Sequence, residues 1–186
     1  MNSVDKFQVA KNKIVEVVSH SEKYEDPGHS LNTLHWVLKL NPDADEIVQL
    51  AALAHDIERG IENRLTVDMF ETYKAYKGAH AIKAAELASG IISDAGYSDQ
   101  DAMRLFAIIK DAETGSDDPD VNLIMDADSI SFFDYIIEYY FKAKDAERTK
   151  KKMWFAYDRA SNRSKKIIDG ILESKPFFQK LFKERN

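Results

Sequence analysis

The chain contains no cysteine, which excludes disulfide bonds, thiol nucleophiles and thiolate metal ligands together. Any metal ion must therefore be held by His, Asp, Glu and water. Seven glycines and four prolines in 186 residues leave few helix breakers, and alternating β-branched runs are missing. No basic segment followed by an apolar one opens the chain, and no apolar run reaches the roughly 18 residues of a membrane span. We therefore expect a cytoplasmic protein without a membrane partner.

A field of positive charge is also missing. The net charge is −6 and the pI is about 5.4, which argues against extended nucleic-acid binding. A few local Lys and Arg residues still suffice to hold a small phosphorylated ligand. The apolar share of 44% and the charged share of 31% are typical of a soluble globular protein. Residues 1–186 are most simply one domain with a substantial core.

Helical periodicity dominates the chain, so the sequence predicts an all-α, single-domain helical bundle. Gly78 is expected to separate two helices, Ser98 to cap the next one with Asp101, and Pro176 to mark the end of the last. The expected helices span residues 4–20, 29–40, 44–58, 66–77, 79–94, 99–113, 121–143 and 146–173.

The most informative motif is the pair His55-Asp56, which follows an apolar run over residues 47–54. A buried helix has no structural reason to finish on an imidazole and a carboxylate. Both side chains are good ligands for a divalent cation, so the pair is a candidate hub of a metal site. Alone, it fits equally a helix C-terminus stabilised by His beside a solvated Asp.

Partner ligands for this pair lie on other helices. His29 begins the second expected helix, and Asp126 lies within an apolar segment, where a carboxylate is costly unless it is paired or liganded. Together His29, His55, Asp56 and Asp126 predict a site for one divalent metal ion. Two imidazoles and two carboxylates suit Mn²⁺, Fe²⁺, Co²⁺, Ni²⁺ or Mg²⁺, with positions left for water and substrate.

This pattern resembles the HD-domain superfamily of metal-dependent phosphohydrolases. That superfamily has a lone His, a His-Asp doublet roughly 25 to 35 residues later and a distant Asp. The matching segments are Asp26-Pro27-Gly28-His29, Ala51-Ala52-Leu53-Ala54-His55-Asp56 and Asp126-Ala127-Asp128. The resemblance covers about residues 26–134, which would form the metal-binding core. Residues 146–186 lie outside it as a C-terminal helical extension. The resemblance implies an α-helical fold and a metal-bound water.

The chain departs from several subgroups of that superfamily. Di-iron oxygenase members add two histidines before the last Asp, whereas this chain offers only His80, with Lys110 where the second would be expected. That difference favours one metal and hydrolysis over two irons and oxidation. The glycine-tyrosine-proline signature of cyclic-dinucleotide phosphodiesterases is missing. Glu58 follows Asp56 by two residues, whereas nucleotidase-like members have an acid at three, which leaves the role of Glu58 in question.

Two ligand positions have competitors. His35 lies on the same expected helix as His29 but about 240° around it, and the family position beside the Asp-Pro-Gly turn favours His29. Asp128 competes with Asp126, which holds the family position.

Several cations are candidates for binding a phosphate group. Arg59 shares a helical face with His55, and Arg159, Arg163 and Lys166 form one basic stripe on the last helix. Each also fits a solvated surface face. The candidate substrate-binding residues are Arg59, His80, Lys110, Arg159 and Arg163.

The sequence thus predicts a hydrolase that acts on a small phosphorylated metabolite or nucleotide through a metal-activated water. Asp56 would both ligate the metal and orient that water, with Glu58 or Asp128 as candidates for proton transfer. The alternative is a regulatory ligand-binding module that keeps the metal cage without turnover. The sequence leaves open whether the protein is a homo-oligomer.

Overall fold

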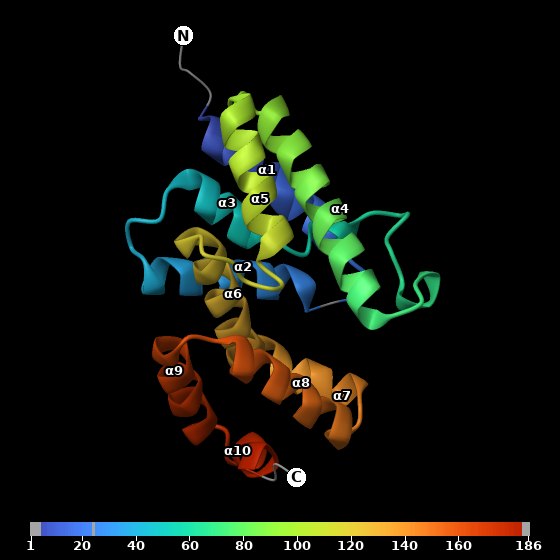
Figure 1. The fold of residues 1–186 in the computed structure, drawn as a ribbon, viewed down its shortest axis with the longest axis vertical. Coiled ribbons are helices and arrows are strands. Elements are labelled where there is room, and N and C mark those ends of the chain that lie inside the picture. Colours follow the sequence, from blue (N-terminus) through green and yellow to red (C-terminus); the bar gives the residue numbers. More distant parts are fainter. Residues whose placement is uncertain (1–4, 24, 184–186) are drawn as a thin grey trace.

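The computed structural model describes residues 5–23 and 25–183, and within these ranges all regular structure is helical. The chain forms one all-α helical domain, as the sequence predicts (Figure 1). None of the described helices is long and apolar enough to cross a membrane. The elements, in chain order, are α1 (Lys6–Ser19), α2 (Asp26–Leu40), α3 (Glu46–Ala54), η1 (Ile57–Gly60), η2 (Val67–Met69), α4 (Tyr73–Asp94), α5 (Asp99–Asp111), α6 (Pro119–Ser131), the π-helix η3 (Phe132–Ile136), α7 (Ile137–Ala143), α8 (Ala146–Arg159), α9 (Asn162–Glu173) and α10 (Pro176–Lys183).

Side-chain caps explain where several helices begin. Asp45 accepts hydrogen bonds from the backbone N–H groups of Ile47 and Val48 at the start of α3. Ser98 and Asp101 form a reciprocal capping box at the start of α5, which confirms the expectation for this pair.

Two helix boundaries differ from the prediction, one at the His-Asp pair and one at Gly78. Helix α3 ends at Ala54, and the backbone leaves helical geometry at Asp56 (φ −113°, ψ 14°) before the 3₁₀ turn η1. The expected helix break at Gly78 is wrong, because α4 continues through it from Tyr73. Gly78 is exposed, and a single glycine costs a helix only about 1 kcal/mol.

The C-terminal half also divides differently from the prediction. The expected helix over 146–173 is two helices, because the extended backbone at Ala160 and Ser161 (ψ 147° and 161°) interrupts it and Ser161 caps α9. Helix α9 ends at Glu173, before Pro176, as expected, but Pro176 begins a further helix, α10, since its fixed φ suits the first turn of a helix. The expected helix over 121–143 contains the π-helix η3, which separates α6 from α7.

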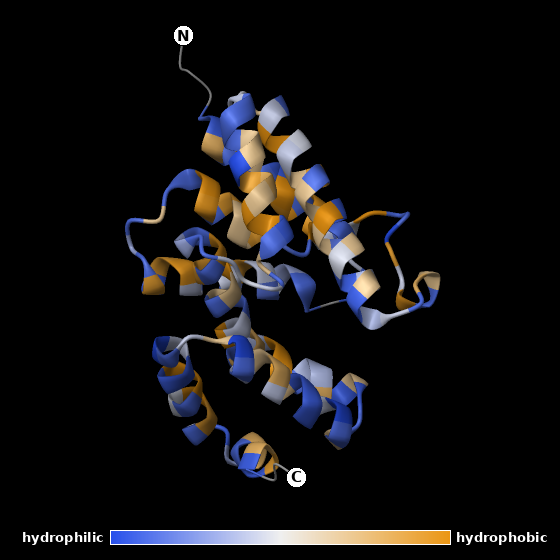
Figure 2. Ribbon diagram, viewed as in Figure 1, coloured by the Kyte–Doolittle hydropathy of each residue, from blue (hydrophilic) through white to orange (hydrophobic). Residues whose placement is uncertain are grey.

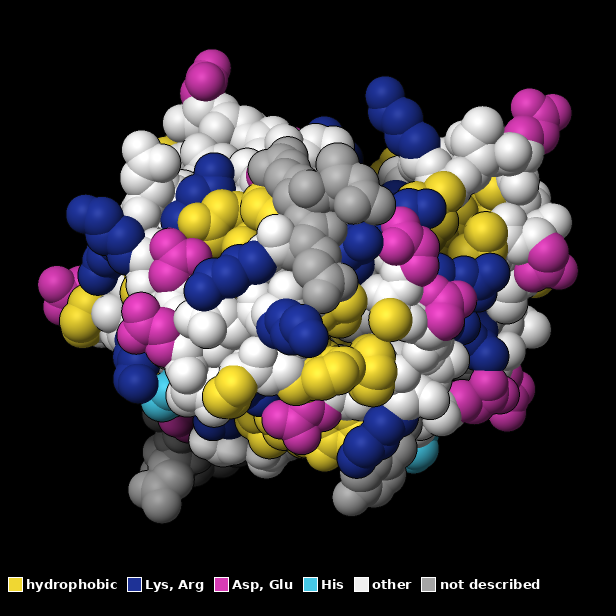
Figure 3. All heavy atoms as spheres, turned by 90° about the horizontal axis from the view of Figure 1, so that it is seen from below, with side chains coloured by type: hydrophobic (Ala, Val, Ile, Leu, Met, Phe, Trp, Pro, Cys, Tyr) yellow, Lys and Arg dark blue, Asp and Glu magenta, His cyan; other side chains and the backbone are white. Residues whose placement is uncertain are grey.

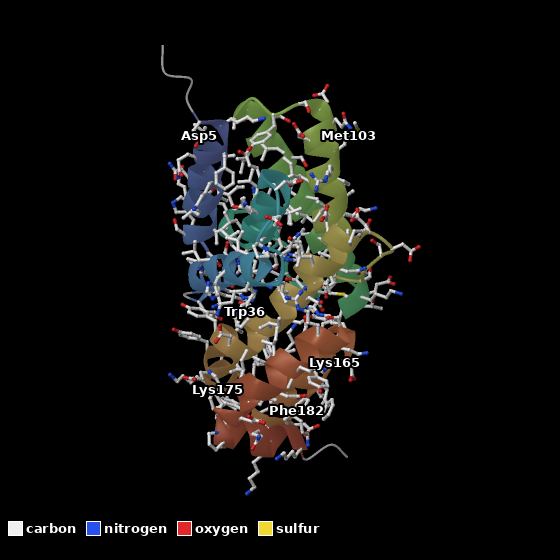
Figure 4. The ribbon with its side chains drawn as sticks, turned by 90° about the vertical axis from the view of Figure 1, so that its left-hand side faces the viewer. Asp5, Trp36, Met103, Lys165, Lys175 and Phe182 are labelled. Carbon is white, nitrogen blue, oxygen red and sulfur yellow. The ribbon has the colours of Figure 1, made fainter. Side chains whose placement is uncertain are left out.

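Helix α3 lies at the centre of the core. All its residues from Leu50 to Ala54 are fully buried, and it packs against α1, α2, α4, α5 and α6. Figure 2 shows apolar residues gathered where α3 meets α5. Figure 4 places Asp5 and Met103 at one end of the molecule and Phe182 at the other, with Trp36 between them. The burial of α3 fixes the position of the His55-Asp56 turn that follows it.

The C-terminal helices α7 to α10 form the other end of the molecule (Figure 1). Several aromatic contacts hold them together, among them the stacking of Trp154 on Phe182 with ring centroids 4.0 Å apart. They are tied to the core by hydrogen bonds such as that from Arg163 to the Leu40 carbonyl (2.9 Å). On the face seen from this end, basic and acidic side chains are interspersed with apolar ones (Figure 3). These helices pack on η3 and α6, which brings α8 beside the His-Asp turn.

Candidate metal centre

Three residues from separate parts of the chain direct potential ligand atoms toward one point. His29 lies in the first turn of α2, His55 follows α3, and Asp128 lies on α6. The Nε2 atom of His29 is 3.0 Å from Oδ1 of Asp128 and 3.3 Å from Nε2 of His55, which is 3.6 Å from the same carboxylate oxygen. Ligand atoms held at about 2.1 Å from a metal are roughly 3.0 Å apart at octahedral angles and about 3.4 Å apart at tetrahedral angles. The three atoms therefore fit one metal ion.

The hydrogen bonds of the two imidazoles leave their Nε2 atoms available as ligands. Nδ1 of His55 lies 2.8 Å from the Ala52 carbonyl, which only accepts, so this nitrogen carries the proton and donates it. Nδ1 of His29 lies 2.9 Å from the Ser131 hydroxyl, which can accept from this nitrogen or donate to it, and Nε2 of His29 faces the Asp128 carboxylate. Two Nε2 atoms that face each other beside a carboxylate are suited to share a bound cation.

Charge around His55 supports the same reading. Burial alone would lower the pKa of His55, but the carboxylates of Asp56 and Asp128 outweigh it and raise this pKa to about 9. The site therefore attracts positive charge to the Nε2 atom, and a metal ion competes there with a proton.

Asp56 borders the three-residue cluster. Its Oδ2 atom lies 3.6 Å from Nε2 of His55 and 3.9 Å from Nε2 of His29, and it pairs with Arg59 at 2.5 Å. Its Oδ1 atom accepts a hydrogen bond from His80 at 2.9 Å. Burial opposes ionisation of Asp56, but Arg59 and the imidazoles hold its pKa well below the ordinary value. Asp56 is thus an ionised carboxylate of fixed orientation at the edge of the candidate metal site.

The structure corrects the assignment of the distant Asp. The Asp126 carboxylate accepts a hydrogen bond from the Ser161 backbone N–H at 2.7 Å and lies outside the cluster. Asp128 takes its place, with Oδ1 toward the imidazoles and Oδ2 paired with Arg159. Two residues along a helix are about 200° apart, so the two side chains leave α6 on different faces. Arg159 and the imidazoles hold the pKa of Asp128 well below its ordinary value, although burial opposes this.

The preference for His29 over His35 agrees with the geometry, because His35 is exposed and packs edge-on against Trp36. Gly28 helps to place His29. A Cβ atom on Gly28 would lie 2.0 Å from the hydroxyl oxygen of Tyr135, so glycine leaves room for the Tyr135 side chain beside the first turn of α2.

Glu58 and His80 form a buried chain behind Asp56. Glu58 is fully buried, accepts a hydrogen bond from Nδ1 of His80 at 2.7 Å and also accepts from the Leu65 backbone N–H. The other ring nitrogen of His80 donates to Asp56. Glu58 does not line the cavity, so the structure does not place it for the expected proton transfer. His80 lines the cavity with both ring nitrogens already bonded, which makes it a support of Asp56.

The candidate metal centre opens into a cavity of about 310 Å³. Arg59, His80 and Arg159 line it, as the sequence predicts for binding residues. Lys110 and Arg163 do not line it. Lys110 pairs with Asp111 at 3.2 Å on the surface, and Arg163 donates a hydrogen bond to the Leu40 carbonyl. The basic and acidic residues that line the cavity are Lys23, Arg59, Lys77, Lys144, Lys152, Arg159, Glu25, Asp26, Asp56, Glu113 and Asp128.

Four lining cations, Lys23, Lys77, Lys144 and Lys152, were not singled out from the sequence, although the spacing of Lys77 and Lys152 carried a signal. Lys77 precedes His80 by three residues and Lys152 precedes Arg159 by seven, so each shares a helical face with a residue that was identified. Lys77 pairs with Glu113 at 2.8 Å. Tyr73, Tyr76 and Tyr140 add an aromatic part to the cavity wall.

Comparison with known proteins assigns the chain to a family but not to a function. A family model described as a domain of unknown function, DUF4202, matches residues 2–181. Neither the search of curated proteins nor the search of solved structures gave a match. Because the family model spans nearly the whole sequence, the chain belongs to the DUF4202 family.

Proposed function

We propose that this protein is a metal-dependent phosphohydrolase of the HD type that acts on a small phosphorylated metabolite or nucleotide. The observation that carries the proposal is the convergence of His29, His55 and Asp128 on the wall of a cavity lined with Lys and Arg side chains. The ligand set supports a metal ion, and the cationic wall supports an anionic substrate.

One divalent ion, such as Mn²⁺, Fe²⁺, Co²⁺, Ni²⁺ or Mg²⁺, would be held by His29, His55 and Asp128, where it lowers the pKa of a bound water and polarises a phosphoryl oxygen. Asp56 contributes its ionised carboxylate beside both imidazoles. With its pKa held low, Asp56 accepts a hydrogen bond from the attacking water and orients it, and is a weak proton acceptor.

The guanidinium groups of Arg59 and Arg159 serve two purposes in this proposal. Each pairs with a carboxylate of the candidate centre, Arg59 with Asp56 and Arg159 with Asp128. Each also lines the cavity, where a guanidinium N–H group not used in these pairs would donate to a phosphoryl oxygen. Such donors offset the charge that develops on the equatorial oxygens during transfer. Arg159 comes from α8, so the C-terminal helices complete the site.

A regulatory module that binds its ligand without turnover is the second candidate. It is favoured by the ion pairs of the cavity carboxylates, because Asp26, Asp56, Glu113 and Asp128 are all paired with Lys or Arg. A site in which four of the five carboxylates are paired with Lys or Arg offers few strong general bases.

The two candidates are separated by phosphate release from a panel of nucleotides and sugar phosphates with added Mn²⁺, Co²⁺, Ni²⁺ or Mg²⁺. The phosphohydrolase proposal expects metal-dependent release that is lost in His55→Ala and Asp128→Asn. Asp126→Asn is the matched control, since Asp126 lies on the same helix outside the cluster, and it should retain turnover per folded molecule. Binding of a phosphorylated ligand without release across the panel would favour the regulatory module.

A further inference from the structure

Lys152 is a lysine in the cavity wall without a carboxylate partner. It lies on α8, is partly buried, and has no ion pair within 4 Å among the residues that the structure describes. Its ammonium group lies 4.9 Å from the ring centre of Phe155 and 5.8 Å from that of Phe132. A cation that is withdrawn from water and unpaired in the protein is a binding element for an anionic ligand.

The charged groups around Lys152 are already matched to one another. Lys77 pairs with Glu113, and Arg159 pairs with Asp128. Burial, together with the charges of Arg159 and Lys77, lowers the pKa of Lys152 to about 8, against the opposing effect of Asp128 and Glu113. The ammonium group therefore sits in an environment that lacks one negative charge.

Lys152 differs from the other unpaired lysines of the cavity. Lys23 and Lys144 also have no ion pair among the described residues, but both are exposed, so water solvates them. Of the three, only Lys152 is withdrawn from water, so it is the one that an anionic ligand would stabilise most.

The charge balance of the cavity indicates the class of that ligand. Six Lys and Arg side chains line the cavity against five carboxylates, so a divalent metal ion raises the excess to three positive charges. A phosphomonoester, which is mainly a dianion at neutral pH, neutralises two of them, whereas a phosphodiester neutralises one.

We propose that Lys152 binds the terminal phosphoryl group of the substrate and makes the cavity selective for phosphomonoesters over phosphodiesters. The substrate class rests on the proposed function, because it assumes a metal ion at His29, His55 and Asp128. The α8 helix would then supply two phosphate contacts, Lys152 and Arg159, seven residues apart on one face.

This proposal predicts opposite effects of one substitution on stability and on phosphate binding. Lys152→Met removes the ammonium group but keeps an apolar stem to pack near Phe132 and Phe155. Because the buried charge destabilises the free protein, this variant should unfold at the same temperature as the wild type or higher at pH 7.5, while it binds phosphate less tightly. If Lys152 had a purely structural role, its replacement would lower the unfolding temperature.

The test measures binding to the Mn²⁺-loaded full chain by calorimetry at pH 7.5, with inorganic phosphate and dimethyl phosphate as probes. We expect the wild type to bind phosphate at least about tenfold more tightly than dimethyl phosphate, and Lys152→Met to lose about tenfold in phosphate affinity. Lys151→Met is the matched control, because Lys151 is exposed, pairs with Glu147 and does not line the cavity.

Equal affinity of the wild type for the two probes, or unchanged phosphate affinity in Lys152→Met, would overturn the proposal. Inorganic phosphate cannot be hydrolysed, so this result does not depend on turnover. A chain that binds phosphate through Lys152 but releases none from the substrate panel would refute the phosphohydrolase and leave the binding role intact. Turnover of monoesters with an unchanged KM in Lys152→Met would support the phosphohydrolase and refute the binding role of Lys152.

Discussion

The Nε2 atoms of His29 and His55 face each other at 3.3 Å, although the two residues are 26 positions apart and come from different helices. Each imidazole is anchored through its Nδ1 atom, one by Ser131 and the other by the Ala52 carbonyl. Two Nε2 lone pairs at this distance repel each other unless a proton or a metal ion lies between them. The arrangement therefore fits a metal ion held between the two imidazoles and Asp128.

Metal binding should raise the stability of the folded chain. Saturation at about 100 times Kd adds about 2.7 kcal/mol to the free energy of unfolding if the unfolded chain does not bind the ion. We expect the Tm to rise with Mn²⁺ and to fall back when a chelator removes it. In His55→Ala the rise should be absent, and an equal rise in this variant would show that the ion binds elsewhere.

The buried chain Glu58–His80–Asp56 predicts a structural role for Glu58. Glu58→Ala leaves a ring nitrogen of His80 and the Leu65 N–H without their partner, which should cost about 1–3 kcal/mol in the free energy of unfolding. Glu58→Gln keeps one acceptor oxygen and should cost less. Urea unfolding of both variants tests this, and a Glu58→Ala variant as stable as the wild type would refute it.

The pKa of Lys152 predicts how stability depends on pH. In the unfolded chain this lysine has its ordinary pKa of 10.5, whereas in the folded chain burial and two neighbouring cations lower it to about 8. Between these values the unfolded chain binds more protons, so the free energy of unfolding rises with pH by up to about 1.4 kcal/mol per unit from this group. The groups that face it are Arg159 on its own helix, Lys77 on α4, Asp128 on α6 and Glu113 after α5.

The measurement is the difference between the wild type and Lys152→Met, since other lysines and tyrosines also titrate at high pH. Lys152→Met should gain stability over the wild type below pH 8, and this gain should shrink toward pH 10.5. A difference that does not change over this range would show that Lys152 titrates normally in the folded protein.

The packing of Tyr135 against Gly28 predicts the effect of a single methyl group. In Gly28→Ala the new Cβ would overlap the Tyr135 side chain, so we expect a loss of about 1–3 kcal/mol together with weaker metal binding through the displaced His29. Adding Tyr135→Ala makes room and should restore the metal affinity. If the double variant binds metal no better than Gly28→Ala, the overlap does not act through His29.

The sequence predicted the all-α fold and two of the three cluster residues, because buried periodicity and the apolar run before His55 are local signals. It missed the third, since Asp126 and Asp128 lie in the same apolar segment and only the rotation of α6 separates them. That rotation was partly readable, because Asp128 shares a face with the buried residues Val121 and Ile124, at i+7 and i+4.

Other features depended on contacts between distant segments. Lys152 lies outside the region that resembles the HD pattern, and its approach to the cavity follows from the packing of α8 on α6 and η3. The break between α8 and α9 lacks a proline or glycine, so helical periodicity alone could not locate it. Glu58 was a plausible proton-transfer group by position, and only the folded structure shows that it is fully buried behind His80 and outside the cavity wall.

The central claim is most directly tested by calorimetric titration of the metal-free chain with Mn²⁺, in the wild type, Asp128→Asn and Asp126→Asn. We predict one ion per chain in the wild type and in Asp126→Asn, and at least about 100-fold weaker binding in Asp128→Asn. Equal affinity in the two variants, or no binding by the wild type, would contradict a metal centre at His29, His55 and Asp128.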